Sequence, residues 1–217
     1  IAIMTQLQHP NVVKYLGTER SRDALHIFIE LAPKGSLQGT ISEYGVLSEN
    51  LARKYTHHIL QGLNYLHTRP QPVIHRDIKG ANVLLWDTGV AKLADFGASK
   101  RLNQLATQTW ENKTMIGTPF WMAPEVIRST GHGRKADIWS IGCTVIEMLN
   151  GRPPWYDLGN PITAMFIIAS TEDFPAMPQK ASDECVGFIK KCLCRDAESR
   201  PTAQELLLDP WLLANPS

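Results

Sequence analysis

The 217-residue sequence predicts an α+β fold, with a small amount of strand near its start and mostly helix after it. Two runs rich in β-branched and aromatic residues come early, at 12–16 and 25–29. The stretch after Ser48 has apolar residues at helical spacing, and the stretch 136–149 is apolar on nearly all sides. A hydrophobic content of 43% in a chain of this length is enough to bury one sizeable core.

The first elements are short. Residues 1–8 carry apolar side chains on one side and are expected to form the end of a helix. The helix should stop at His9, because Pro10 disfavours helical backbone in the residue before it. The two strand segments are then joined through residues 17–23, and residues 33–36 form a loop.

The later elements are helices with recognisable start signals. Ser48 is expected to cap a long helix. Its apolar residues at helical spacing are Leu51, Tyr55, Ile59, Leu63 and Leu66. The apolar helix at 136–149 should lie at the centre of the domain. Thr202 and Glu205 form a capping box that is expected to start the last helix.

Composition and charge exclude several classes of function. The net charge of +1 gives no reason to expect nucleic-acid binding. No apolar run is long enough to span a bilayer, since the best candidate, 138–149, is short and contains Glu147. No signal peptide opens the chain, and a cytoplasmic location is expected. The chain begins with Ile1 rather than Met, so we expect it to be a piece of a longer product.

The four cysteines all lie in the second half of the chain, at positions 143, 185, 192 and 194. Cys192 and Cys194 have a spacing that suggests a metal site, but no second Cys or His pair stands at ligand spacing. They also fall in an apparent helix, where alternate residues point apart. We therefore interpret the cysteines as packing residues in a reducing compartment rather than as zinc ligands.

Three motifs follow one another in the middle of the chain. They are His-Arg-Asp-Ile-Lys-Gly-Ala-Asn at 75–82, Asp-Phe-Gly at 95–97 and Ala-Pro-Glu at 123–125. A lone triplet is weak evidence, but here the order, the spacing and the flanks agree. Short buried strands are expected on either side, at 73–74 and 92–94, with a turn between them at 86–90.

With these motifs the chain resembles the eukaryotic protein kinase family along its whole length, and Lys79 is typical of the serine/threonine type. The resemblance implies that Asp77 orients the substrate hydroxyl and accepts its proton. It implies that Asn82 and Asp95 bind Mg²⁺ and that Lys79 contacts the γ-phosphate of ATP. His75, Phe96 and Gly97 would hold the catalytic loop and the metal-binding turn in register.

The resemblance also implies an ATP site and a set of supporting contacts. Ile29 would guard the back of the ATP pocket, and the backbone of Glu30 and Ala32 would bind adenine. The full set of implied ATP-binding residues is Ile29, Glu30, Ala32, Lys79, Asn82, Leu84 and Asp95. Asp137 would hydrogen-bond the catalytic-loop backbone, and Arg200 would pair with Glu125 under the activation segment, 95–125.

Arg76 before the catalytic aspartate implies control by phosphorylation, because a phosphate on the activation segment would pair with a buried arginine. Thr114 is the first choice for the phosphorylated residue, and Thr107 and Thr109 are second choices. Thr118 is expected instead to order the catalytic loop by hydrogen bonding.

The resemblance divides the chain into a remnant of the small lobe with the hinge, 1–32, and a mostly helical large lobe, 33–217. The remnant would hold two strands and a helix end. The sequence contains no Gly-rich loop, and the glutamate of the family's C helix would stand one place before Ile1. We therefore expect little or no activity from this chain by itself and a working kinase in the intact protein.

Residues 117–125 resemble the Sterile-type kinases of the MAP kinase cascade, and the motifs at 95–102, 133–140 and 143–148 narrow the resemblance to MAP kinase kinase kinases of the MEKK type. The implied substrate is a serine or threonine in a MAP kinase kinase. A Sterile-20-type kinase is the alternative within the family. A pseudokinase that serves as a scaffold is the alternative outside catalysis, although Asp77, Asn82 and Asp95 are all intact.

Overall fold

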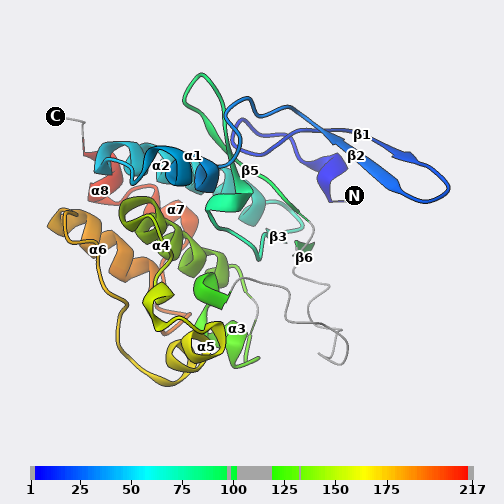
Figure 1. Cartoon of the computed structure of the whole chain (residues 1–217). Helices are drawn as coiled ribbons and strands as arrows, with labels where there is room; N and C mark the ends of the chain where they lie inside the picture. Colours follow the sequence, from blue (N-terminus) through cyan, green and yellow to red (C-terminus); the bar gives the residue numbers. More distant parts are fainter. Residues whose placement is uncertain (1–2, 97–98, 102–118, 132, 215–217) are drawn as a thin grey trace.

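The computed structural model describes residues 3–96, 99–101, 119–131 and 133–214. A body made mostly of helices carries a long β-hairpin that projects to one side (Figure 1). The helices are α1 (Leu37–Tyr44), α2 (Glu49–His67), α3 (Pro124–Ile127), α4 (Lys135–Asn150), α5 (Pro161–Ser170), α6 (Asp183–Cys192), α7 (Ala203–Leu206) and α8 (Pro210–Leu213). Single-turn 3₁₀ helices are η1 (Met4–Gln6), η2 (Gly80–Asn82), η4 (Pro119–Trp121) and η5 (Tyr156–Leu158). The predicted α+β class is confirmed.

The strands of the described residues form three small antiparallel sheets of two strands each. They pair β1 (Tyr15–Arg20) with β2 (Leu25–Ile29), β3 (Val73–Ile74) with β6 (Lys100–Arg101), and β4 (Val83–Leu85) with β5 (Ala91–Leu93). The turn between β4 and β5 closes with the Trp86 N–H on the Val90 carbonyl at 3.0 Å, and Gly89 supplies the positive φ of 71° that the turn needs. The turn predicted at 86–90 is therefore confirmed.

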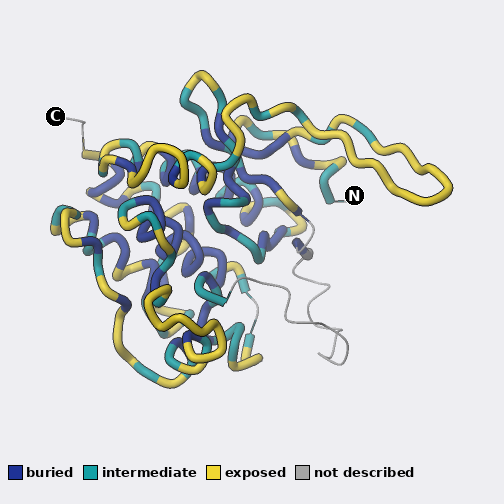
Figure 2. Tube along the Cα trace, viewed as in Figure 1, coloured by how far each residue is buried: buried dark blue, intermediate teal, exposed yellow. Residues whose placement is uncertain are grey.

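Helix α4 forms the centre of the body, as its all-round apolar sequence predicts. Every residue from Ala136 to Met148 is buried, and the helix packs against α6 and α2 (Figure 2). Where α4 meets α6, a Cβ added at Gly142 would lie 2.8 Å from the Cys192 Cβ, so a larger residue could not fit without displacement. The core is thus closely packed around α4.

The predicted start signals act as expected. The Ser48 side chain accepts the Leu51 N–H and starts α2, which runs to His67. Thr202 and Glu205 form both halves of the capping box. The helix they start, α7, is only one turn long and α8 follows it, so the expectation that it is the last helix is wrong. Asp209 caps α8, with Pro210 at its first turn.

Three of the four cysteines are packing residues in the body, and Cys194 is partly exposed. Cys143, Cys185 and Cys192 are fully buried, and burial raises the pKa of the Cys185 thiol to about 12. All four cysteines are free. Helix α6 ends at Cys192, so Cys194 lies beyond it rather than within the helix expected there. A buried thiol that stays protonated is inert as a metal ligand, which supports the packing interpretation.

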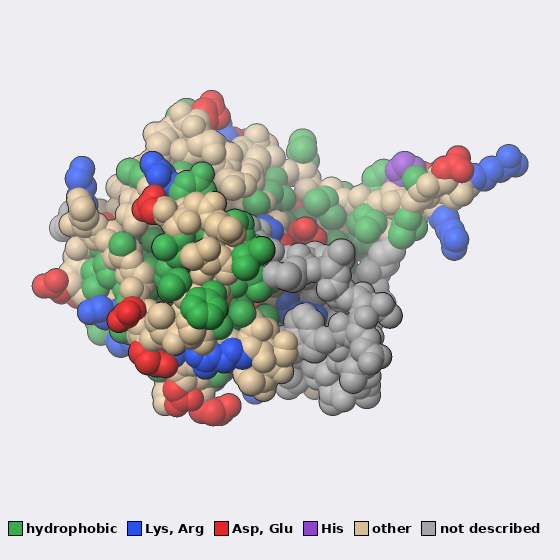
Figure 3. All heavy atoms as spheres, turned by 60° about the horizontal axis from the view of Figure 1, so that its bottom comes forward, with side chains coloured by type: hydrophobic (Ala, Val, Ile, Leu, Met, Phe, Trp, Pro, Cys, Tyr) green, Lys and Arg blue, Asp and Glu red, His purple; other side chains and the backbone are tan. Residues whose placement is uncertain are grey.

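The projecting hairpin contrasts with the body. All five residues of β2 are exposed, and Figures 2 and 3 show the hairpin standing out from the body. Phe28 is 49% exposed. Ser21 and Ala24 close its tip, with the Ser21 N–H on the Ala24 carbonyl at 2.9 Å. No residue of β1 or β2 belongs to the buried apolar core, and the two strands pair with each other through backbone hydrogen bonds.

Two boundaries in the first part of the chain differ from the prediction. The helix expected over residues 1–8 is, in the described residues, only the single turn η1. The strand expected at 12–16 is shifted, since β1 begins at Tyr15 and continues to Arg20. The reason is that Val13 bonds to another strand, with its N–H on the Leu93 carbonyl at 2.9 Å. The apolar residues Val12 and Val13 thus mark the buried segment that attaches to β5, whereas strand β1 contains no buried residue.

Candidate active site

The segment from His75 to Asn82 forms a loop between β3 and β4, and α4 holds it from below. The Asp137 carboxylate accepts the His75 N–H at 2.9 Å and the Arg76 N–H at 2.8 Å. His67 on α2 binds the same carboxylate at 2.8 Å. Asp137 is 1% exposed. The contact expected between Asp137 and the backbone of this loop is therefore present.

These contacts explain a strained backbone. Arg76 has a φ of 73°, in the left-handed region that non-glycine residues rarely adopt, at a cost of roughly 1–3 kcal/mol. The two N–H groups that point at Asp137 hold it there. Burial by itself raises the pKa of Asp137, but the hydrogen bond from His67, the charge of His67 and the hydrogen bond from the Arg76 N–H outweigh it and lower the pKa. Asp137 is thus a buried, ionised anchor for the loop.

Two side chains of the loop meet at the carboxylate of a third, Asp77. Lys79 Nζ lies 3.0 Å from Asp77 Oδ1 and 2.9 Å from Oδ2. Asn82 Nδ2 donates to Asp77 Oδ2 at 2.7 Å and to the Asp77 carbonyl at 2.8 Å. Since the Asn82 amide uses its nitrogen here, its oxygen Oδ1 is the atom suited to a cation. The structure therefore brings together Asp77, Lys79 and Asn82, as the sequence predicts.

The β4–β5 hairpin places the second predicted metal ligand beside the first. Asn82 stands directly before β4, Asp95 comes just after β5, and the Ala94 N–H donates to the Asn82 carbonyl at 2.9 Å. An amide oxygen and a carboxylate suit Mg²⁺, which binds one or two such groups and takes its other ligands from water and phosphate. Within the described residues no cluster of three or more His, Cys, Asp or Glu forms a complete metal cage. This pair fits a cation that arrives with a phosphate.

His75 and Phe96 pack against each other with ring centroids 5.1 Å apart. The His75 Nε2 donates to the Ala94 carbonyl at 3.0 Å, while Nδ1 faces the Asp77 N–H at 3.4 Å. Burial lowers the pKa of His75, so its ring is neutral at neutral pH. The packing contact expected between the loop and the metal-binding turn is therefore present, and Gly97 lies outside the described residues.

A second buried ion pair supports the end of the activation segment. Arg200 is fully buried and binds Glu125 through Nη1 at 2.8 Å and Nη2 at 3.2 Å. Its remaining donors reach the carbonyls of Lys135 and Cys194. The contact expected between Arg200 and Glu125 is present, and it attaches α3 to the C-terminal part of the body. Thr107, Thr109, Thr114 and Thr118 lie outside the described residues.

The residues expected at the ATP site lie near the base of the hairpin. Ile29 ends β2 and is 40% exposed, Glu30 and Ala32 follow it, and Leu84 lies in β4. Inside the chain, the Glu30 N–H donates to the Lys14 carbonyl and the Ala32 carbonyl accepts the Gly35 N–H. The Glu30 carbonyl and the Ala32 N–H are therefore the groups suited to a ligand.

Sequence reasoning missed Glu147, a buried carboxylate under the loop. It is 3% exposed, and its Oε2 accepts the Gly80 N–H at 2.9 Å and the Trp121 Nε1–H at 3.0 Å. Burial raises the pKa of Glu147. A Cβ at position 80 would lie 2.5 Å from Glu147 Oε1, which explains the glycine. The available signal was a single acidic residue in an otherwise apolar helix.

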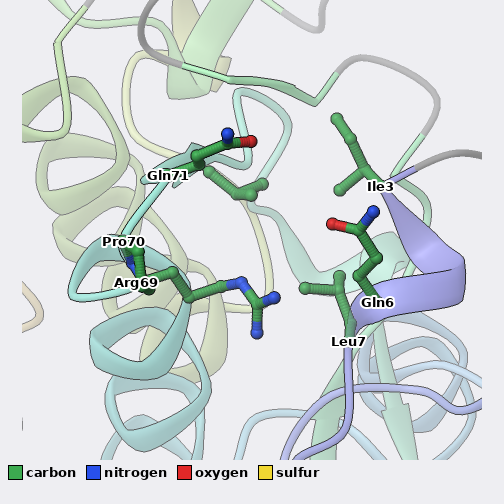
Figure 4. A pocket seen from close by; sticks show the side chains of 7 residues that line it. Ile3, Gln6, Leu7, Arg69, Pro70 and Gln71 are labelled. Atoms are coloured by element: carbon green, nitrogen blue, oxygen red, sulfur yellow. The ribbon is translucent and has the colours of Figure 1, made fainter.

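A hollow of about 340 Å³ lies elsewhere, between η1 and the segment that links α2 to β3. Figure 4 shows Arg69 reaching across it toward Gln6 and Leu7. None of the predicted catalytic or ATP-binding residues lines this hollow. It is therefore separate from the candidate active site.

Comparisons with known proteins identify the family of the chain. The family model of the protein kinase domain matches residues 1–212. Similar curated proteins are the mitogen-activated protein kinase kinase kinases ANP1 of Arabidopsis thaliana (47% identity over 98% of this chain and 32% of that protein), A of Dictyostelium discoideum (44%, 98% and 22%) and 3 of Homo sapiens (44%, 95% and 33%). The chain thus spans about a third or less of these relatives. In the part of the chain that the structure describes, no helix is both long and apolar enough to cross a membrane.

Proposed function

We propose, from the premise that this chain belongs to the protein kinase family, that the protein carrying it phosphorylates a serine or threonine of a MAP kinase kinase. The observation that carries the proposal is the meeting of Lys79 and Asn82 on the Asp77 carboxylate, with Asp95 at the same end of the β4–β5 hairpin. The similarity to MAP kinase kinase kinases supports the substrate.

We propose the following role for each group. Asp77 accepts the proton of the substrate hydroxyl. At the same time the hydroxyl oxygen forms a bond to the γ-phosphorus of ATP, and the bond between that phosphorus and ADP breaks. Lys79 is held beside Asp77, where its charge stabilises the transferring phosphoryl group. Asn82 and Asp95 would hold Mg²⁺, which when bound neutralises charge on the β- and γ-phosphates. The Glu30 carbonyl and the Ala32 N–H would bind adenine, and Leu84 would line the same site.

The test is phosphate transfer by the full-length protein. With ATP, Mg²⁺ and a purified MAP kinase kinase, we expect phosphate on serine or threonine, and Asp77→Asn should lower kcat by roughly 10²- to 10⁴-fold. Transfer to none of the MAP kinase kinases of the source organism would contradict the substrate assignment. Tight ATP binding without any transfer would instead favour the scaffold reading. Transfer to a MAP kinase kinase kinase would favour the Sterile-20-type reading.

We also propose that residues 1–32 belong to the small lobe and hinge and residues 33–217 to the large lobe. The isolated 217-residue polypeptide should then be weakly active or inactive, because it contains no Gly-rich loop to cover the phosphates. The four free cysteines support a location in the reducing cytoplasm. Imaging of the tagged full-length protein in cells tests that location, and accumulation in the secretory pathway would contradict it.

Regulation by phosphorylation is proposed at Thr114. Burial lowers the pKa of the Arg76 guanidinium, because it disfavours the charged form. A phosphate nearby would stabilise this cation. We expect Thr114→Ala in the full-length protein to reduce phosphorylation of the MAP kinase kinase. Thr107→Ala and Thr109→Ala serve as comparisons in the same assay. Full activity of Thr114→Ala would remove this residue as the switch.

A further inference from the structure

An ion pair joins Glu30, directly after strand β2 of the projecting hairpin, to Lys92 in strand β5, which leads to Asp95. Lys92 Nζ in β5 lies 2.8 Å from Glu30 Oε1 and 2.7 Å from Oε2, so it contacts both oxygens. The two side chains are 17% and 22% exposed. This pair is therefore largely withdrawn from water, where an ion pair is screened less than at the surface.

Each partner is also restrained by a second group. Glu30 Oε1 accepts the Lys14 N–H at 2.8 Å, while the Glu30 N–H donates to the Lys14 carbonyl at 3.0 Å. The Lys92 ammonium lies 4.3 Å from the centre of the Trp86 ring, within the range of a cation–π contact. Neither side chain can move without losing a further interaction.

The Glu30–Lys92 pair links the end of β2 to the β4–β5 hairpin of the candidate active site. Lys92 stands opposite Leu84 in the β4–β5 register, on the hairpin that carries Asn82 and Asp95 at its end. All residues of β2 are exposed, so burial does not fix the end of that strand. Backbone hydrogen bonds such as that from Lys34 N–H to the Leu85 carbonyl, at 3.3 Å, attach the following loop. The ion pair adds a side-chain link between Glu30 itself and β5.

We infer that Lys92 is a positioning residue for the nucleotide. Through Glu30 it holds the backbone of Glu30 and Ala32 at a set place relative to Leu84 and to the metal-binding end of β4–β5. The inference rests on the proposed function, because it takes the ligand of this site to be ATP. Lys92 itself does not contact the reacting atoms in this arrangement.

The test compares Lys92→Met with Lys191→Met in the full-length protein. Methionine retains an apolar stem that can lie on Trp86 and removes the charge. Lys191 is a matched control, since it also makes a 2.7 Å ion pair, with Asp209, but lies on α6. Direct binding of ATP, measured by calorimetry without protein substrate, gives a Kd. The KM for ATP and the KM for the protein substrate are then measured separately.

We expect Lys92→Met to raise the Kd and the KM for ATP by about tenfold, the effect of losing one charge-assisted hydrogen bond. The KM for the protein substrate should stay unchanged. A general loss of folded protein would instead lower the apparent kcat and leave both KM values unchanged. Glu30→Gln should also raise the Kd for ATP. The double variant should bind ATP no more weakly than the single variant with the lower affinity for ATP. That cycle keeps the test decisive if Lys92→Met folds poorly.

Three results would overturn the inference: equal ATP affinity in Lys92→Met and Lys191→Met, additive losses in the double variant, or no ATP binding by the unmodified protein. Failure of the proposed function has a different signature. In that case the unmodified protein binds ATP, and Lys92→Met weakens that binding, but no phosphate reaches any MAP kinase kinase.

Discussion

Helix α4 and strand β2 show two ways in which this protein sets the position of a backbone. Every residue from Ala136 to Met148 in α4 is buried, while all five residues of β2 are exposed. The buried helix fixes the catalytic loop through Asp137 and Glu147, whose carboxylates accept backbone N–H groups. The exposed strand is fixed by backbone hydrogen bonds and by the link between Glu30 and Lys92. Catalytic geometry should therefore resist surface changes more than nucleotide affinity does.

The largest effect is expected where a buried charge loses its partner. Arg200→Met leaves the Glu125 carboxylate without its bidentate partner, which should lower the free energy of unfolding by about 3–5 kcal/mol. Urea denaturation measures this change. Arg152→Met, at an exposed 3.4 Å pair with Asp157, is the control and should cost less than about 1 kcal/mol. Similar losses in both variants would show that burial does not set the difference.

A smaller effect is expected at the anchor of the catalytic loop. Asp137→Asn keeps the shape but turns one oxygen into an NH₂ group, so one of the loop N–H groups or His67 loses its acceptor. We expect the free energy of unfolding to fall by about 1–3 kcal/mol. In the full-length protein kcat should fall while the KM for ATP changes little, because Arg76 and Asp77 shift. An unchanged kcat would mean that the strained loop holds its shape without this anchor.

Glu147 offers a test by pH. Since its folded pKa is raised above the ordinary value of 4.5, the native state binds this proton more tightly than the unfolded chain does. Its contribution to stability is thus fully present below about 4.5 and is lost as pH rises through the folded pKa. Glu147→Gln is always neutral and keeps an oxygen for the Gly80 and Trp121 donors.

The Glu147→Gln variant should therefore gain stability relative to the wild type as pH rises above 4.5, and the two should lie within about 1 kcal/mol at pH 7. Denaturation curves from pH 4 to 8 check the trend. The control Glu147→Leu offers no acceptor and should be less stable by about 1–3 kcal/mol. If the stability of Glu147→Gln relative to the wild type decreased as pH rises, this would contradict the argument that burial raises the pKa of Glu147.

The smallest effect is expected in the hairpin. Phe28→Ala removes an exposed ring and should change the free energy of unfolding of this chain by no more than about 0.5 kcal/mol. The same substitution at Phe188, which is fully buried in α6, should cost about 3–5 kcal/mol. Thermal or urea unfolding of the 217-residue chain measures both. A large loss at Phe28 would mean that the hairpin packs on the body more closely than its exposure indicates.

Sequence reasoning was most successful where a short local signal has one physical meaning. Ser48 caps α2 because its hydroxyl reaches the Leu51 N–H, and the apolar run of α4 can only be buried. The contact of Asp137 with the His75 N–H and the contact of Arg200 with Glu125 followed from the family resemblance. The two residues of each contact lie 62 and 75 positions apart in the chain, respectively. No local pattern specifies contacts over such separations.

Reasoning from sequence was least successful at the start of the chain. Strand β1 contains no buried residue, so no buried apolar side chain marks its ends, and the prediction followed the buried apolar pair Val12 and Val13 instead. Glu147 was noticed only as an interruption of an apolar segment. Its role depends on Gly80 and Trp121, which the fold brings from two other segments.

The amino-acid sequence by itself determined the fold class, the caps of α2 and α7, and the identity of the residues at 75–82 and 95–97, because these depend on side-chain type and local spacing. Tertiary structure alone decided which carboxylates hold the catalytic loop, and that Lys92 reaches Glu30 across the base of the hairpin. Such contacts arise where separate elements pack, and there burial makes each hydrogen bond and ion pair costly to leave unpaired.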